Sequence, residues 1–254
     1  MGAPDVFRRH EIKYLLSEEQ YLALRARMEG RCLPDAYPKS RIRNLYFDTP
    51  DWRIIRASME RPVYKEKLRL RSYRKAEKGT KVFLEIKKKY HSVVYKRRIS
   101  LPEEDAERFI AGRGDLPPSQ IAREIKAFVR TYPNLSPAVF LSYDREAFRE
   151  NGTDLRITFD RNIRFRWEDL SLCSEAYGER VLPEGKVLME LKTCEAIPLW
   201  LVSFLTAESL YKTHFSKYGA AYETMLLRGE ASPAGVTILA AETAPCEKRR
   251  IYQC

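Results

Sequence analysis

Lysine and arginine side chains alternate with apolar side chains along several stretches of this sequence. In one of them, Lys67, Arg69 and Arg71 are separated from one another by Leu68 and Leu70. Because successive side chains of a β-strand point to opposite faces, the cations share one face and the leucines share the other. A row of cations on one strand face suits an anionic ligand, and a chain of phosphates offers a matching row of charges.

Five further stretches repeat this pattern, at 9–16, 81–89, 94–99, 155–160 and 187–192. In each of them one face is apolar, and the other combines Lys or Arg with a few Glu or Asp. The cations of these polar faces are candidate ligands of the same anion. Besides Lys67, Arg69 and Arg71, the candidates are Lys13, Lys87, Lys96, Arg98, Arg156 and Lys192.

Two arrangements of such strands are open. The ordinary one is a half-exposed sheet with a buried apolar face and a solvated charged face. The other is an antiparallel barrel whose apolar outer face is covered by helices and whose charged face lines a tunnel. The bias toward cations favours the tunnel, as do the amphipathic helices, which need an apolar surface. So many cations repel one another unless a polyanion or the interleaved carboxylates neutralise them.

Two of those carboxylates, Glu85 and Glu190, lie on the same strand faces as Lys87 and Lys192. They could be ion-pair partners that hold the lysines in place. They could also hold Mg²⁺ or Mn²⁺, which prefer carboxylate oxygens and bridge to substrate phosphates. Phosphoryl transfer requires cations and metal around the transferred group, with an acceptor in line, and this set of residues meets that requirement.

The composition narrows the class of protein. A chain of 254 residues that is 44% hydrophobic can form one substantial core. A net charge of +11 predicts an anionic partner, which could be nucleic acid, a phosphate-rich metabolite or an acidic membrane surface. We do not expect nucleic acid, because aromatic residues are not interleaved with the basic faces as a stacking platform requires.

Cysteine and histidine placement argues against a disulfide framework and a zinc site. The five Cys are scattered without a C-x-x-C pair, and the three His have no metal-ligand spacing. No apolar run approaches the roughly 20 residues of a membrane span, and the N-terminal MGAPDVFRRHE lacks a signal-peptide core. We therefore expect a soluble cytoplasmic protein. An unidentified membrane or regulatory partner is compatible with this expectation.

The pattern of elements indicates an α+β fold of seven or eight mostly antiparallel strands with helices inserted between them. We expect one domain over 1–229 and a poorly ordered tail over 230–254. Ser17 and Gln20 predict a capping box, Thr49 with Pro50 predicts the start of a short helix, and Asn151-Gly152 predicts a hairpin. Strands are expected over 5–16, 41–48, 63–74, 80–89, 93–100, 138–148, 154–166 and 186–193. Helices are expected over 17–30, 102–112, 118–131, 197–212 and 218–228.

Nine of these stretches, in this order, resemble the triphosphate tunnel metalloenzyme (CYTH-like) superfamily, and specifically its VTC-type polyphosphate polymerase branch. The stretches are HEIKYLL (10–16), NLYFDTPDW (44–52), KLRLRSY (67–73), FLEIKKK (83–89), YKRRI (95–99), SYDREAF (142–148), LRITFDRN (155–162), LMELK (188–192) and HFSKY (214–218). The resemblance implies an eight-stranded antiparallel β-barrel, the triphosphate tunnel, with helices packed on its outside.

The resemblance also implies roles for individual residues. Glu190 would hold the divalent metal, Mn²⁺ or Mg²⁺. Ser216 and Lys217 would contact phosphate at one end of the tunnel, where a helix start also suits an anion. Tyr143 would flank the nucleotide base. The phosphate ligands would be Lys13, Arg69, Arg71, Lys87, Lys96, Arg145 and Arg156.

In the polymerase branch, the γ-phosphate of a nucleoside triphosphate passes to a growing polyphosphate chain inside the tunnel. The resemblance thus implies a metal-dependent phosphotransferase that acts on ATP and inorganic polyphosphate or triphosphate. Arg9 stands where hydrolase members of the superfamily carry the first Glu of E-x-E-x-K, which argues against two-metal hydrolysis. Hydrolysis of tripolyphosphate or a nucleoside triphosphate, and polyphosphate binding without catalysis, are the alternatives.

Overall fold

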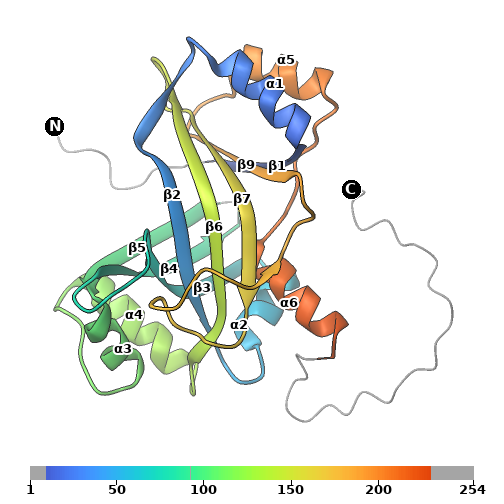
Figure 1. Ribbon diagram of the computed structural model, residues 1–254. Helices are drawn as coiled ribbons and strands as arrows, with labels where there is room; N and C mark the ends of the chain where they lie inside the picture. Colours follow the sequence, from blue (N-terminus) through green and yellow to red (C-terminus); the bar gives the residue numbers. More distant parts are fainter. Residues whose placement is uncertain (1–9, 92, 230–254) are drawn as a thin grey trace, which may run out of the picture.

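A computed structural model describes residues 10–91 and 93–229 of the chain, which alternate between strands and short helices (Figure 1). Residues 1–9 and the tail predicted for 230–254 lie outside the described residues. The strands are β1 (His10–Ser17), β2 (Cys32–Asp48), β3 (Tyr64–Ser72), β4 (Lys81–Tyr90), β5 (Val93–Pro102), β6 (Ser136–Glu150), β7 (Arg156–Arg166), β8 (Glu179–Arg180) and β9 (Lys186–Thr193). The helices are α1 (Glu18–Met28), α2 (Arg53–Met59), α3 (Glu103–Ile110), α4 (Gln120–Thr131), α5 (Leu199–Ala207) and α6 (Lys217–Leu227).

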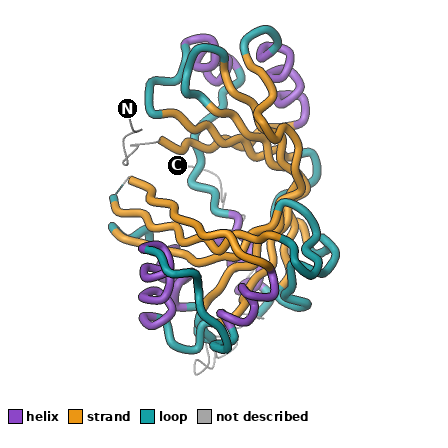
Figure 2. Tube along the Cα trace, turned by 90° about the vertical axis from the view of Figure 1, so that its left-hand side faces the viewer, coloured by secondary structure: helices purple, strands orange, loops and turns teal. Residues whose placement is uncertain are grey.

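The strands form a single antiparallel sheet in the order β1-β9-β7-β6-β2-β3-β4-β5, with β8 beside β7. Figure 2 shows that this sheet is strongly curled, so that its ends approach each other. In the described part of the chain, no strand pairing joins the edge strands β1 and β5. The α+β class and the antiparallel tunnel-type sheet are confirmed, with a curl that is not closed by backbone hydrogen bonds.

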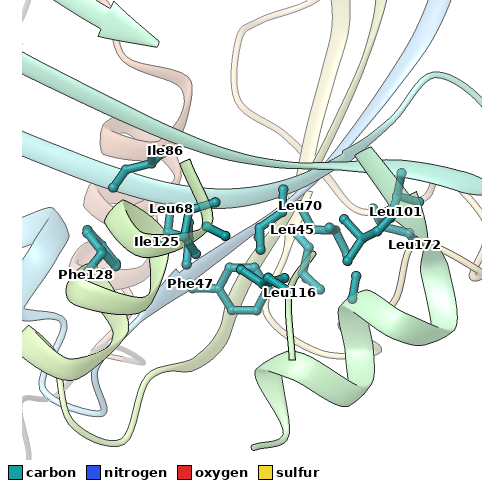
Figure 3. Close-up of a cluster of buried hydrophobic side chains, with 14 of the residues drawn as sticks. Leu45, Phe47, Leu68, Leu70, Ile86, Leu101, Leu116, Ile125, Phe128 and Leu172 are labelled. Carbon is teal, nitrogen blue, oxygen red and sulfur yellow. The ribbon is translucent and has the colours of Figure 1, made fainter. Parts of the chain in front are cut away.

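The outer face of β2 to β5 is apolar and covered by α3 and α4. Leu68 and Leu70 of β3 pack with Leu84 of β4 against Ala106 of α3 and Ile125 of α4. Figure 3 shows Leu68, Leu70 and Ile125 in this cluster. Each of these side chains is nearly inaccessible to solvent. The leucines that alternate with the cations of β3 thus point outward to helices, as the alternation predicts for a tunnel lining.

The outer face of β1, β7 and β9 is covered in the same way by α1 and α5. Leu16, Ile157 and Met189 of these strands are buried with Leu24 of α1 and Phe204 of α5. The capping box at the start of α1 is confirmed: Gln20 N donates to Ser17 Oγ, and Ser17 N donates to Gln20 Oε1.

Helix α6 differs from the expectation that all helices pack outside. It lies on the inner face, where Tyr218 and Met225 pack against Leu141 of β6 and Leu188 of β9. Leu188 shares its strand face with Glu190 and Lys192, because β-strand side chains alternate. One part of the inner face is therefore apolar and covered by α6, and the other part is charged.

The start of α2 also differs from the prediction. The helix begins at Arg53 with Trp52 as its N-cap, at a φ of 59°, so Thr49 is not the N-cap. The Thr49 hydroxyl still accepts a hydrogen bond from the N–H of Arg53, and the buried carboxylate of Asp48 accepts from the N–H groups of Ile54 and Ile55. Two side chains that precede the helix therefore satisfy the free N–H groups at its start.

One strand was mispredicted in extent and another was missed. Strand β2 begins at Cys32, well before the expected residue 41, and its pairing with β6 is irregular between Pro34 and Lys39. The two-residue strand β8 was not predicted. The hairpin at Asn151-Gly152 is confirmed, and Gly152 takes a φ of 75° there.

Candidate functional site

Cross-strand register places the predicted cations in rows on the inner face. Lys67 of β3 pairs with Lys87 of β4, and Lys87 pairs in turn with Lys96 of β5. Arg69 pairs with Glu85 in the next row. Directly paired residues of antiparallel strands point to the same face, so the rows continue across three strands.

Glu190 of β9 is the centre of a first charged group, the Glu190 cluster. Its Oε1 lies 3.7 Å from Lys13 Nζ and 3.3 Å from Lys217 Nζ. Its Oε2 lies 3.2 Å from both Arg145 Nη2 and Lys192 Nζ. Burial alone would raise the pKa of Glu190, but Lys217, Lys192 and Arg145 outweigh burial and hold the pKa well below its usual value. Glu190 is therefore ionised at neutral pH.

Asp160 of β7 completes the Glu190 cluster, and it is a residue that the sequence did not single out. Arg145 donates to it from Nε and Nη2 at 2.6 Å each, and Lys217 Nζ lies 2.6 Å from Asp160 Oδ2. The Asp160 side chain is inaccessible to solvent. Burial would raise its pKa, but Arg145 and Lys217 lower it. Asp160 thus fixes the orientation of two predicted phosphate ligands.

Glu85 of β4 is the centre of a second group, the Glu85 cluster. Arg69 Nη2 and Lys96 Nζ lie 2.8 and 2.7 Å from its carboxylate oxygens, and Arg71 Nε lies 3.7 Å away. Burial raises the pKa of Glu85, but Arg69, Arg71 and Lys96 bring it down to about 2. Both predicted metal ligands are therefore ion-paired with cations in this structure.

Tyr143 of β6 connects the two clusters. Its hydroxyl accepts a hydrogen bond from Arg71 Nη2 at 3.2 Å. Its ring lies 5.3 Å from the guanidinium carbon of Arg145 and 4.6 Å from Lys217 Nζ. Only 4% of Tyr143 is exposed. The sequence did not indicate that this tyrosine would be enclosed by cations.

The first turn of α6 meets the charged part of the inner face. Ser216 is the N-cap, and its Oγ accepts from Gly219 N and lies 3.5 Å from Lys67 Nζ. Lys13 Nζ donates to the carbonyl of Phe215 at 2.9 Å. Ser216 and Lys217 are thus placed among the strand cations.

Tyr218 fixes this helix start to the sheet. Its hydroxyl donates to Asp48 at 2.7 Å, and its ring stacks on Tyr46 with the centroids 4.7 Å apart. Tyr46 in turn accepts a hydrogen bond from Arg69 Nη1 at 2.8 Å. Helix α6 and the Glu85 cluster are therefore linked through two tyrosines that sequence reasoning missed.

Three predicted cations lie at the margins of this assembly. Arg156 Nε is 2.5 Å from Asp35, which also binds Arg149. Lys87 Nζ is 3.4 Å from Glu11, an ion pair that spans from β4 to β1. Arg98 is exposed and lies over the ring of Phe83. The structure brings together Lys13, Lys67, Arg69, Arg71, Lys96, Tyr143, Arg145, Lys192, Ser216, Lys217, Glu85 and Glu190.

The crowding of these cations changes the protonation of three lysines. Burial, with the nearby Lys65 and Lys87, lowers the pKa of Lys67 to about 7. Burial, with Arg71 and Arg69, lowers the pKa of Lys96 to about 7 against the pull of Glu85. Burial also lowers the pKa of Lys192 to about 8. The site without a ligand carries more cations than its carboxylates can compensate.

The donor set fits a divalent ion only if substrate supplies some of the ligands. Over residues 10–91 and 93–229, His, Cys, Asp and Glu form no group of three or more that could hold a metal. Glu85 is a single carboxylate among cations, and Glu190 shares Arg145 and Lys217 with one other carboxylate, Asp160. Mg²⁺ is commonly bound by one or two carboxylates with substrate phosphates and water, and either residue could supply such a carboxylate once a phosphate engages its cations.

One of three comparisons with solved structures supports the fold. A structure named "putative adenylate cyclase" from Bacillus halodurans is 15% identical, with a TM-score of 0.50, over 82% of this chain and 95% of that one. A protein of the same name from Vibrio parahaemolyticus is 10% identical, with a TM-score of 0.45, over 86% and 99%. The PH1819 protein from Pyrococcus horikoshii is 13% identical, with a TM-score of 0.40, over 85% and 99%. At these identities, the first likeness shows the fold alone.

No curated protein matches the sequence. None of the described helices is long and apolar enough to cross a membrane. The VTC domain matches residues 8–226, which covers both charged clusters and the helix that begins at Lys217. The chain belongs to the VTC domain family.

Proposed function

We propose that this protein is a polyphosphate polymerase that transfers the γ-phosphate of ATP to a growing chain of inorganic polyphosphate. One observation carries the proposal: the Glu190 and Glu85 clusters form a continuous cationic inner face, joined by Tyr143. Lysine and arginine outnumber the carboxylates there, so the face is complementary to a linear polyanion. Membership of the VTC domain family supports the same substrate class.

The cations have carboxylate partners that a phosphate chain can replace. Lys13, Lys192 and Lys217 now share Glu190, and phosphate oxygens would accept the same hydrogen bonds. Arg69 and Arg71, held by Glu85 and by hydroxyl or amide groups, present fixed forks to the next phosphates. The ligand-free site is therefore organised in advance, which lowers the entropic cost of binding.

Glu190 and Glu85 would hold Mn²⁺ or Mg²⁺, as the superfamily suggests for a divalent ion. When bound, the ion would neutralise charge on the transferred phosphoryl group. When a phosphate chain binds, Asp160 would keep its contacts with Arg145 and Lys217, and Glu190 would lose some of its contacts with four cations. Of Asp160 and Glu190, Glu190 is therefore better placed to bind an ion beside the phosphates.

The transfer itself requires little from protein acids and bases. A terminal phosphate oxygen of the acceptor chain attacks the γ-phosphorus, and the bond to the β-bridging oxygen breaks. Its electron pair leaves with ADP, so no proton has to be removed from the nucleophile. The inner carboxylates suit this reaction, because low pKa values make Glu85 and Glu190 poor general bases.

One observation favours hydrolysis as a second candidate function. Lys67 and Lys96 have pKa values of about 7, so a fraction of each is neutral at neutral pH and could accept a proton from water. A bound phosphate chain would raise both pKa values and remove that capacity. The two functions therefore differ in whether water or phosphate occupies the acceptor position.

The test is a product gel on the purified full-length protein with ATP and Mn²⁺. A ladder of phosphates longer than triphosphate is the expected result. Orthophosphate without a ladder would show that the protein hydrolyses ATP and would contradict the proposal. Tight tripolyphosphate binding with neither product would indicate a binding module and contradict the catalytic proposal.

A pH dependence follows from Lys67. In the free protein this lysine is protonated below about pH 7 and loses its proton above it, whereas a bound polyanion restores the charge. The contribution of Lys67 to tripolyphosphate affinity should therefore fall as the pH rises above about 7. An arginine keeps its charge throughout.

The measurement compares wild type with Lys67→Arg by calorimetric titration of tripolyphosphate between about pH 6 and pH 9. Titration of the ligand affects both proteins equally, so it cancels in the ratio of their affinities. We expect this ratio to move in favour of Lys67→Arg by up to about tenfold per pH unit above pH 7. A ratio that does not change with pH would refute the assignment.

A further inference from the structure

An aromatic pair with an arginine lies at one end of the inner face, beside the Glu85 cluster. Phe83 of β4 contacts Tyr73, which directly follows β3, edge to face with the ring centroids 5.6 Å apart. The guanidinium carbon of Arg98 of β5 lies 4.7 Å from the centroid of Phe83. Tyr73 is 41% exposed, Phe83 is partly exposed and Arg98 is exposed. We call these three residues the aromatic mouth.

The aromatic mouth continues the rows of phosphate-binding cations. Phe83 pairs with Arg71 across β3 and β4, and Arg98 pairs with Glu85 across β4 and β5. Residues two apart on a strand share a face and are about 7 Å apart. Tyr73 is therefore one row beyond Arg71 on the same face, and Phe83 is one row beyond Glu85.

Arg98 is differently placed from the other cations of the inner face. Among the described residues it forms no ion pair with a carboxylate, whereas Arg69, Arg71 and Lys96 all lie against Glu85. Its guanidinium lies over the Phe83 ring instead. An exposed guanidinium beside partly exposed rings is a stacking surface for another flat, polarisable group.

We propose that the aromatic mouth binds the nucleobase of the nucleoside triphosphate. The inference rests on the proposed function, because it supplies the base site for the same substrate. With the triphosphate on Arg69, Arg71 and Lys96, the nucleoside would extend toward the open end of the rows. There the base would stack on Phe83 and Tyr73, and Arg98 would move from the ring of Phe83 to the base or the α-phosphate.

The position of Tyr143 supports this location. The family resemblance implies a base beside Tyr143, but only 4% of that tyrosine is exposed and its ring lies against Arg145 and Lys217. A base could reach it only by displacing cations that phosphates need. Tyr73 and Phe83 need no such displacement, because their surfaces are already exposed in part.

The chemistry of the aromatic mouth predicts weak discrimination among bases. Stacking accepts any base, because each has a π-face, and the three side chains offer no rigid pair of donor and acceptor to read a base edge. ATP and GTP should therefore bind with similar affinity. Inorganic tripolyphosphate, which lacks a base, should not depend on the aromatic mouth at all.

The test measures affinities of ATP and tripolyphosphate for the full-length protein without divalent metal, so that no turnover occurs. Phe83→Ala should weaken ATP binding about tenfold and leave tripolyphosphate binding unchanged. Phe83→Trp should retain ATP binding. Tyr73→Ala should resemble Phe83→Ala, and its matched control is Tyr95→Ala. Tyr95 is 42% exposed but lies next to Lys96 in β5, so it points to the opposite face.

The possible outcomes distinguish a failure of the base site from a failure of the proposed function. A parallel loss of both ligands in Phe83→Ala, or no loss of ATP, would overturn the base site and leave the phosphate site standing. A loss of thermal stability with an unchanged ratio of the two affinities would mark the aromatic pair as structural only. Wild-type protein that binds neither ligand would overturn the proposed function together with the base site.

Discussion

Glu190→Gln lowers the rate of phosphate transfer at least about 100-fold and leaves tripolyphosphate affinity unchanged or higher. The substitution removes the charge on which Lys13, Lys192, Lys217 and Arg145 converge. It removes no cation, so the inner face becomes more positive and holds a polyanion at least as well. A divalent ion contributes several kcal/mol to transition-state stabilisation, and each 1.36 kcal/mol is tenfold in rate.

Turnover with ATP and calorimetric affinity for tripolyphosphate are the two measurements. Glu124→Gln is the matched control, because Glu124 also pairs with two cations, Lys88 and Arg97, but does so on α4 outside the sheet. That control should keep the wild-type rate. Full activity in Glu190→Gln would show that this carboxylate holds no catalytic ion.

Asp160→Asn lowers the free energy of unfolding by about 3 kcal/mol, because removing one partner leaves buried charges uncompensated. Arg145 and Lys217 would lose their 2.6 Å contacts with Asp160 and keep only the longer ones to Glu190. Urea unfolding measures the change. The midpoint should shift while the dependence on denaturant stays constant.

Asp144→Asn is a close control on the preceding strand of the sheet. Asp144 of β6 also lies 2.6 Å from an arginine, Arg41, but those side chains are 34% and 60% exposed. An exposed pair contributes about 0–1 kcal/mol, so Asp144→Asn should change stability little. Equal effects in the two variants would contradict the claim that burial sets the strength of the Asp160 pair.

The alternation of charged and apolar residues was enough to predict which face of most strands points inward. The leucines of β3 and the apolar residues of β4 lie under α3 and α4, as that pattern requires. Period-two patterning is a local property of the chain, and one face must be buried. The helix expected over 218–228 is present as α6, but local pattern could not predict that it lies on the inner face, because its residues pack on Leu141 and Leu188 from distant strands.

The sequence left open that Glu85 and Glu190 form ion pairs with lysines, but it could not predict most of the actual partners inside the site. Asp160 shares a strand face with Arg156 and Thr158, so its direction was predictable, but its contacts with Arg145 and Lys217 depend on two other elements. The burial of Tyr143 is likewise set by Arg71, Arg145 and Lys217. The sequence did contain one indication of these ion pairs: a buried carboxylate needs a partner, and cations were available on the neighbouring strand faces.

The two clusters explain how a site so rich in cations can exist without its ligand. Glu190 and Asp160 hold one half of the cations, and Glu85 holds most of the other half. Lowered pKa values of Lys67, Lys96 and Lys192 reduce the positive charge that the carboxylates do not neutralise. A phosphate chain would replace both forms of compensation at once, which is why its binding should be coupled to proton uptake.

The most direct test of the account follows the γ-phosphate of ATP. The full-length protein is mixed with γ-³²P-labelled ATP, Mn²⁺ and unlabelled tripolyphosphate, and the products of a single turnover are separated on a gel. Transfer to phosphate predicts label in tetraphosphate. Label found only in orthophosphate would contradict the account, because water would then be the acceptor.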